Sequence, residues 1–242
     1  MVDSFLYTYP PLQEGILLKR YKRFLADIEL KSGEIITAHC PNTGPMTGLA
    51  IPGNLVQVSS SDNPKRKLPY TWEMIQVHDT KPTWVGTNTG LPNKIVKLAL
   101  EQKLFPELTP HYSQIRPEVR YGVEGKSRID FLLSDEGKPP IYLEVKSTTW
   151  AQGKRVLFPD TVTTRGQKHL KDLMAITPEA KAVMLYFINR GDCIEFAPGD
   201  AADQRYGELL REARSCGVQV LPYRFEISPQ GVRFIGLAKT AF

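Results

Sequence analysis

Three charged residues, Asp130, Glu144 and Lys146, have the types and spacing that metal-dependent hydrolysis needs. Asp130 lies in the apolar segment RIDFLL (128–133), and Glu144 and Lys146 lie in IYLEVKS (141–147). Side chains alternate between the faces of a β-strand, so Glu144 and Lys146 are expected to share one face. A hairpin between the two segments would bring Asp130 beside Glu144. The sequence therefore predicts two carboxylates and one amine at a single site.

Two adjacent carboxylates repel each other, and a divalent cation between them relieves this repulsion. Hard oxygen ligands suit Mg²⁺, for which Mn²⁺ can substitute, so Asp130 and Glu144 are the predicted metal ligands. Lys146 beside the metal would orient or deprotonate a water molecule, or neutralise charge on a pentavalent phosphate. The three residues are the predicted catalytic residues of a phosphodiester hydrolase.

The spacing D-x13-ExK matches the PD-(D/E)xK pattern of restriction-endonuclease-like proteins, with Ile129 in place of the proline. The alternative is that the three residues form ordinary surface salt bridges. The order of elements favours the nuclease-like interpretation. Periodicity predicts a helix over 93–104, strands over 114–123, 127–133 and 139–147, a helix over 165–175, a buried strand over 180–188, a short strand over 192–196, a helix over 202–215, and closing strands over 218–227 and 231–237.

The first third of the chain has a different character. Short strands are predicted over 24–30, 34–40, 55–61 and 70–77, separated by turns rich in Gly, Pro and Asn. Several short strands without a helix suggest a five-stranded, oligonucleotide-binding (OB)-like barrel. We therefore predict a two-domain protein that combines an α+β and an α/β character. Residues 1–80 form the OB-like barrel, and residues 81–242 form the PD-(D/E)xK nuclease-like α/β domain.

Basic residues gather in three places, two of them together with aromatic rings. Cations beside stacking rings are typical of single-strand binding, and basic residues at a helix N-terminus favour phosphate. The alternatives are that the rings belong to the core, that the cations are only solvated, and that His169 packs beneath its helix. The predicted nucleic-acid-binding residues are Arg20, Lys22 and Arg23, with Tyr21 and Phe24; Lys65, Arg66 and Lys67, with Tyr70 and Trp72; and Arg165, Lys168 and His169.

Charge, hydropathy and cysteine content indicate where the protein is located and which classes of protein are excluded. The net charge is +5, and residues 1–80 are balanced, so the excess lies in residues 81–242. No apolar run approaches the ~20 residues that span a bilayer, and no secretory signal is recognisable. We expect a cytoplasmic protein without a membrane partner. The three cysteines, Cys40, Cys193 and Cys216, are too few and too widely spaced for a disulfide framework, and we expect them to be buried.

Several long motifs in the same order make the chain resemble the sugar fermentation stimulation protein (SfsA) family. The motifs are RYKRFLADIEL, AHCPNTGPMTGL, NPKRKLPYTWE, RIDFLL, YLEVKS and FPDTVTTRGQKHLKDL. The resemblance implies a DNA-binding protein linked to the regulation of sugar, notably maltose, utilisation. It also implies the same barrel and nuclease-like domain, with the nuclease motif on Asp130, Glu144 and Lys146.

One position departs from this family. Relatives often carry Glu at the position of Leu98, in the first helix of the nuclease-like domain. Glu101 lies three residues further on, near the same helix face. The sequence therefore leaves open whether the metal has a third carboxylate, and with it whether the site holds two metals. A short echo is also visible, because Asn42-Thr43-Gly44 is repeated as Asn88-Thr89-Gly90.

Three functions follow as hypotheses. The first is a DNA-binding regulator that carries a nuclease-type metal site, and the alternative is a Mg²⁺-dependent DNA endo- or exonuclease that uses Asp130, Glu144 and Lys146. Single- and double-stranded DNA both stay open as partners. The third is a small-ligand sensor, which is weaker because the sequence has no Gly-rich phosphate loop.

Overall fold

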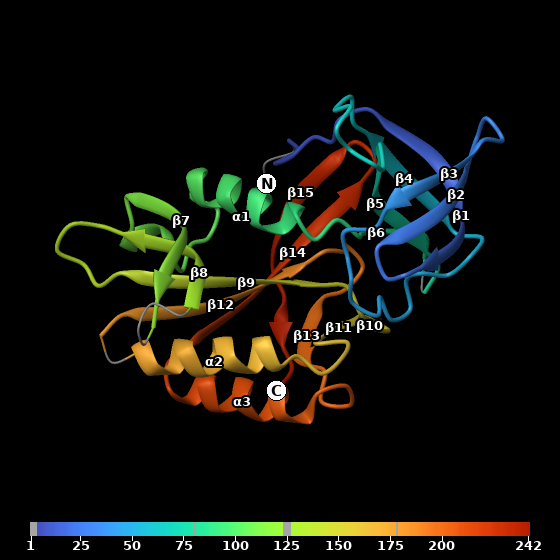
Figure 1. Cartoon of the computed structure of the whole chain (residues 1–242). Helices are drawn as coiled ribbons and strands as arrows, with labels where there is room; N and C mark the ends of the chain where they lie inside the picture. The colour runs from blue at the N-terminus through green and yellow to red at the C-terminus, as the bar shows by residue number, and fades with distance from the viewer. Residues whose placement is uncertain (1–3, 80, 123–126, 178) are drawn as a thin grey trace.

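A computed structural model describes residues 4–79, 81–122, 127–177 and 179–242, and its chain forms a β-barrel followed by a larger α/β part (Figure 1). In the barrel, β2 pairs with β1 and β3, β1 with β4, and β4 with β5, all antiparallel. A contact between His39 and Thr71 joins β3 to β5 and closes it. This is the predicted five-stranded barrel. Its strands are β1 (Leu12–Tyr21), β2 (Leu25–Leu30), β3 (Ile35–His39), β4 (Leu55–Ser60) and β5 (Tyr70–Val77).

The barrel strands follow the period of two that the sequence predicts. In β2, Ala26, Ile28 and Leu30 point into the barrel core. The first strand, β1, was not predicted as a separate strand. Its outward side chains Ile16 and Leu18 are apolar although they are exposed, so apolar residues occupy both of its faces and hide the alternation.

The larger part is a sheet covered by helices on both faces (Figure 1). Its strands lie in the order β14-β12-β9-β8-β7, with β12 parallel to both β9 and β14. One core cluster lies between the sheet and α1, and a second lies between the sheet and the pair α2 and α3. The elements are α1 (Leu91–Glu101), β7 (Gln114–Tyr121), β8 (Ser127–Ser134), β9 (Ile141–Thr148), α2 (Thr164–Ile176), β12 (Lys181–Ile188), α3 (Gln204–Ser215), β14 (Gln219–Ser228) and β15 (Gly231–Leu237).

The predicted helices and long strands of this part are present, and β12 is buried along almost its whole length, as its continuous apolar run predicts. The strand predicted over 114–123 is present as β7, which ends at Tyr121. Val123, the last residue of that prediction, lies outside the described residues. Cys216, which we expected to be buried, is exposed just beyond α3.

A second, smaller sheet was not predicted as such. The segment predicted as a strand over 192–196 contributes to it, but the strand is shifted to Glu195–Pro198. Its members are too short to show a period in the sequence. The strands of this sheet are β10 (Ala151–Gln152), β11 (Arg155–Phe158), β13 (Glu195–Pro198) and β16 (Lys239–Thr240), and a 3₁₀ turn, η1 (Thr109–His111), lies after α1.

The barrel and the α/β part share hydrogen bonds rather than a free linker. Strand β6 (Thr83–Gly86) pairs with β5 of the barrel and with β14 of the larger sheet. The backbone of Gly86 also exchanges hydrogen bonds with Asn189, just beyond β12. A Cβ at residue 86 would come within 2.2 Å of the Asn189 Oδ1 atom, so this close approach requires glycine.

A buried arginine ties the same junction. The guanidinium of Arg190 is 1% exposed, and it donates to Asp79 Oδ2 (2.6 Å) and Asp192 Oδ2 (2.7 Å). It also donates to the Thr149 carbonyl oxygen (3.0 Å), just after β9. The end of the barrel, β9 and the segment after β12 therefore meet at one cation.

Within the described parts of the chain, no helix has the length and apolar character that a bilayer crossing needs.

We predict that Arg190→Ala lowers the free energy of unfolding by about 3–5 kcal/mol, because it leaves the 2% exposed carboxylate of Asp192 buried without its cation. Chemical denaturation measures this loss. Arg205→Ala is the matched control, since Arg205 pairs with Glu208 on the exposed face of α3, and its loss should cost less than about 1 kcal/mol. Equal losses in the two variants would contradict the role given to Arg190.

Candidate functional site

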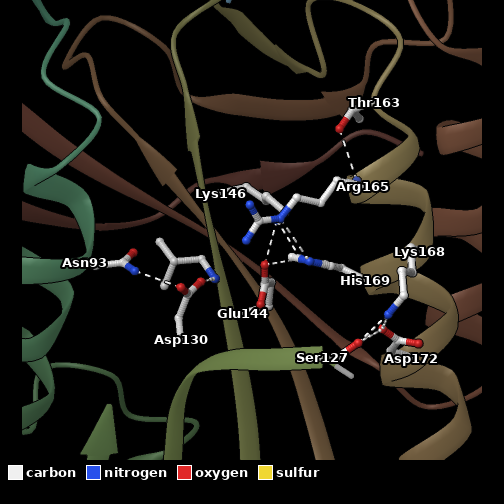
Figure 2. A network of polar contacts seen from close by, with 12 residues as sticks. Asn93, Ser127, Asp130, Glu144, Lys146, Thr163, Arg165, Lys168, His169 and Asp172 are labelled. Atoms are coloured by element: carbon white, nitrogen blue, oxygen red, sulfur yellow. Dashed lines mark hydrogen bonds and ion pairs between the residues drawn. The ribbon is translucent and has the colours of Figure 1, made fainter. Parts of the chain in front are cut away.

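Glu144 lies at the centre of the candidate site, in the middle of β9 (Figure 2). The side chain is buried, and its Oε1 atom accepts a hydrogen bond from Lys146 Nζ at 2.6 Å. His169 of α2 contacts the same oxygen through Nδ1. The second oxygen, Oε2, is buried and has no hydrogen-bond partner among the described residues. A buried carboxylate oxygen without a hydrogen-bond donor destabilises the folded protein unless a ligand binds to it.

Asp130 reaches the same place from the neighbouring strand β8. Its Oδ2 atom accepts a hydrogen bond from the Val145 amide (2.7 Å), which lies between Glu144 and Lys146 on β9. Its Oδ1 atom accepts one from the Asn93 side chain (2.8 Å), in the first turn of α1. Each carboxylate oxygen has two lone pairs, so Asp130 can still bind a cation.

The two carboxylates titrate differently because their neighbours differ. Burial and the charge of Glu144 raise the pKa of Asp130 to about 6. Burial alone would raise the pKa of Glu144 too, but the hydrogen bond from His169 and the charge of Lys146 hold it below its ordinary value. Two carboxyl groups with separated pKa values and a shared lysine are typical of a functional site.

The contacts of His169 indicate its tautomer. Arg165 Nε, which can only donate, lies 3.4 Å from His169 Nε2. That nitrogen therefore accepts, and Nδ1 carries the proton and donates to Glu144. The approach of Lys146 Nζ to Nδ1, at 3.0 Å, is then a close contact between two donors that share one acceptor. His169 thus packs beneath α2, as the alternative interpretation held, and it also orients the central carboxylate.

The two cations of α2 that we predicted to bind nucleic acid, Arg165 and Lys168, point in different directions (Figure 2). Arg165 is exposed and lines the cleft above Glu144. Lys168 points to the side, where it pairs with Asp172 at 2.6 Å and contacts Ser127. Of the two cations, Arg165 is the one that faces the site.

Asp130, Glu144, Lys146 and Arg165 line one open cleft of about 530 Å³. Two further members, Asn93 and Glu118, were missed by the sequence analysis. Glu118 lies on β7 opposite Asp130 and has a left-handed backbone (φ 55°), which is strained for a residue other than glycine. The sequence signal was weak for both, because their roles depend on which strand and helix lie next to β8.

Neither Leu98 nor Glu101 brings a third carboxylate into the cleft. Leu98 packs against the core, and Glu101 is exposed and pairs with Lys97 at 3.7 Å. The cleft meets the first turn of α1, at Asn93, whereas Glu101 lies about two turns further along the helix. In the described residues, no three His, Cys, Asp or Glu side chains are grouped closely enough to hold a metal by themselves.

The first basic motif of the barrel lies at the turn between β1 and β2. Lys22 and Arg23 both have positive φ (48° and 67°) and lie exposed between β1 and β2. The guanidinium of Arg20 points back into the protein, where it donates to the carbonyl oxygens of Arg23 (2.7 Å), Asn42 (2.9 Å) and Gly44 (2.8 Å). Lys22 and Arg23 are therefore available to a ligand, and Arg20 shapes the loops beside them.

The second basic motif is an exposed loop that contains Lys65, Arg66 and Lys67, between β4 and β5. Arg66 donates to Thr71 Oγ1 at 2.9 Å. Trp72, which we had grouped with these cations as a stacking ring, is fully buried in the barrel core. Its ring is therefore structural, as the alternative interpretation held.

Comparison with known proteins agrees with both parts of the fold. The model of the SfsA N-terminal OB domain matches residues 18–87, and that of the sugar fermentation stimulation protein RE domain matches residues 90–231. A solved structure of SfsA from Pyrococcus furiosus in complex with Ca²⁺ is similar over 99% of this chain and all of that one, with a TM-score of 0.87 and 26% identity. The predicted fold, an OB-like barrel plus a restriction-endonuclease-like domain, is confirmed.

Curated relatives named sugar fermentation stimulation protein homolog cover nearly the whole chain. The relative from Nostoc punctiforme is 66% identical over 99% of both chains. The relative from Picosynechococcus sp. is 65% identical over 98% of this chain and 94% of its own. The chain therefore belongs to the sugar fermentation stimulation protein family.

Proposed function

We propose that this protein binds nucleic acid, DNA in the first instance, and hydrolyses its phosphodiester bonds with a divalent cation, Mg²⁺ or Mn²⁺, held by Asp130 and Glu144. The observation that carries the proposal is the buried Oε2 atom of Glu144, which has no partner among the described residues and belongs to a residue that lines an open cleft. A bound cation would complete this oxygen and relieve the repulsion between the two carboxylates.

The donor set fits such an ion. Asp130 and Glu144 supply hard oxygen ligands, and the other ligands of Mg²⁺ are commonly water and substrate phosphate. The related Pyrococcus furiosus structure, with Ca²⁺ bound, supports a cation that prefers oxygen. The ion would act as a Lewis acid and lower the pKa of bound water.

The residues of the chain divide the remaining work. Asn93 and the Val145 amide orient Asp130, and His169 orients Glu144. Lys146 would place a water molecule or neutralise charge on the phosphate, and Arg165, exposed in the cleft, would hold a phosphate oxygen. On this proposal Asp130, Glu144 and Lys146 are catalytic, as the motif predicts.

A second candidate is binding without cleavage. The lack of a carboxylate from α1 favours it, because Leu98 packs against the core and Glu101 pairs with Lys97 outside the cleft. On this candidate the cleft serves as a cradle for DNA, and the protein acts as the regulator of sugar, notably maltose, utilisation that the family resemblance implies. Both candidates share the exposed cations Lys22, Arg23, Lys65 and Lys67 as DNA contacts.

Asp130→Asn and Glu144→Gln should each lower cleavage of single- or double-stranded DNA by at least about 100-fold, because each removes a metal ligand. The assay compares Mg²⁺ or Mn²⁺ with EDTA on purified protein. Glu208→Gln, an exposed carboxylate on α3, is the matched control and should keep full activity. Absence of cleavage by the unaltered protein with either metal, together with DNA binding that survives Glu144→Gln, would favour the second candidate.

The raised pKa of Asp130 predicts a pH-dependent stability in EDTA. Between the ordinary carboxyl pKa of 3.8 and the pKa of about 6 in the folded protein, Asp130 holds a proton that the unfolded chain has lost. This group therefore makes folding less favourable as pH rises through that window. The free energy of unfolding of wild type, minus that of Asp130→Asn, should therefore fall by about 2 kcal/mol from pH 4 to pH 7. Urea titrations at several pH values measure it, and a constant difference would contradict it.

Lys22→Ala and Lys65→Ala should each lower the salt dependence of DNA binding by about one unit of slope, because each removes one phosphate contact. Fluorescence anisotropy over a range of NaCl concentrations measures the slope. Lys31→Ala, whose amine pairs with Glu14 elsewhere on the barrel at 2.9 Å, is the control and should leave the slope unchanged. An unchanged slope in both test variants would show that Lys22 and Lys65 do not contact the DNA phosphates.

A further inference from the structure

A second, smaller pocket of about 150 Å³ opens where the barrel meets the α/β part. It shares two lining residues, Thr89 and Ser147, with the metal cleft, so the two cavities are neighbours. Ser147 follows Lys146 on β9, and the pocket continues along the same segment to Trp150. Whatever lies at the metal site can therefore extend directly into this pocket.

The barrel side of the pocket is built by the repeated Asn-Thr-Gly motif. In each copy the asparagine Oδ1 accepts the glycine amide, from Gly44 to Asn42 (2.9 Å) and from Gly90 to Asn88 (3.0 Å). Thr89 of the second copy donates to the Pro41 carbonyl oxygen (3.0 Å) beside the first. The two loops are thereby fastened together at the pocket.

Arg20, near the end of β1, holds the first of these loops. Its guanidinium donates to the carbonyl oxygens of Asn42 and Gly44 and to that of Arg23. Arg20 therefore fixes Asn42 in the pocket wall and, at the same time, fixes the exposed Lys22–Arg23 turn next to it.

The opposite wall contains an aromatic ring in a fixed place. A Cβ at Gly199 would lie 3.0 Å from Trp150 Cζ3 and 2.3 Å from the Pro159 carbonyl oxygen, so the ring packs against a bare backbone. The Trp150 carbonyl oxygen also accepts the Leu157 amide at 2.8 Å. Trp150 is only partly buried and lines the pocket. Its packing suits a stacking platform.

The lining chemistry selects against phosphate. None of the described lining residues is basic, and one, Asp160, is a carboxylate. Within the described chain, Asp160 accepts one long hydrogen bond, from the Thr47 amide at 3.5 Å. A carboxylate in a pocket without cations repels an anion and accepts N–H groups. Cations lie on either side instead, at the Lys22–Arg23 turn and at Lys146 and Arg165 in the cleft.

The size of the pocket sets what it can hold. Pockets that enclose a whole small-molecule ligand measure ~300–1,000 Å³, so about 150 Å³ suits one ring system rather than a complete nucleotide. A flat ring beside Trp150, with N–H groups toward Asp160, matches a nucleobase that carries an exocyclic amine. Adenine, cytosine and guanine carry such an amine, and thymine does not.

We propose that this junction pocket, defined by Asn42, Thr89, Thr149, Trp150 and Asp160, holds one unpaired amino-bearing nucleobase, next to the phosphate bound in the metal cleft. The inference rests on the proposed function for the position of that phosphate. It names the substrate class as single-stranded or locally unpaired nucleic acid, because a base inside a duplex cannot enter the pocket without leaving the stack.

Oligonucleotide binding in Ca²⁺ tests this pocket separately from cleavage. Single-stranded dC, dA and dT oligomers and a duplex of equal length are titrated with wild type, Trp150→Phe, Trp150→Ala and Asp160→Asn. Wild type should bind dC and dA more tightly than dT, and any single strand more tightly than duplex. Trp150→Ala should weaken single-strand binding about 10-fold, with Trp150→Phe intermediate and duplex binding unchanged. Asp160→Asn should remove the preference for dC and dA over dT.

Several outcomes would overturn the proposal. The first is that Trp150→Phe and Asp160→Asn, both shown to be folded by circular dichroism, bind every oligomer with the same affinity as wild type. Another is a duplex preference in wild type. If the protein cleaves DNA in Mg²⁺ but neither Trp150→Phe nor Asp160→Asn changes binding, the pocket proposal is rejected and the nuclease proposal is supported. The predicted binding changes without cleavage would support the pocket and reject the nuclease.

Discussion

The buried carboxylate of Glu144 is the constraint around which the rest of the site is arranged. A charge removed from water needs partners, and Lys146 and His169 supply them on one oxygen. Because His169 belongs to α2, this requirement also fixes how that helix lies against the sheet and carries Arg165 into the cleft. The second oxygen of Glu144 stays without a protein donor in the described chain, and it is the oxygen that the proposed cation would complete.

The sheet explains why the site forms at this place. Strands β8 and β9 lie side by side, so Asp130 and Glu144 come together through backbone pairing, and the Val145 amide links them. The first turns of α1 and α2 reach the same cleft and add Asn93 and Arg165 (Figure 2). The pairing of β6 with both β5 and β14 then sets the barrel beside this cleft, so its loops form part of one surface with it.

Sequence periodicity was sufficient for the central pair and insufficient for its surroundings. The alternation in IYLEVKS places Glu144 and Lys146 on one face, and the structure has them in contact at 2.6 Å. Asn93 and Glu118 could not be found in this way, because their positions depend on how α1 and β7 pack. The Lys22–Arg23 turn could not be recognised from the sequence, because it has neither the Gly nor the Asn that usually marks a left-handed turn.

The basic residues show most clearly what the sequence cannot predict, because the sequence does not indicate which group a lysine or arginine contacts in the folded protein. Arg20 and Lys22 lie in one motif, yet Arg20 is satisfied by carbonyl oxygens of the protein and Lys22 projects from a turn. Arg165 and Lys168 lie in one helix, yet Lys168 is paired with Asp172 and Arg165 faces the cleft. The net charge of +5 is therefore a poor guide to the binding surface. Of these cations, Arg165 lines a cleft whose own centre is acidic, at Asp130 and Glu144.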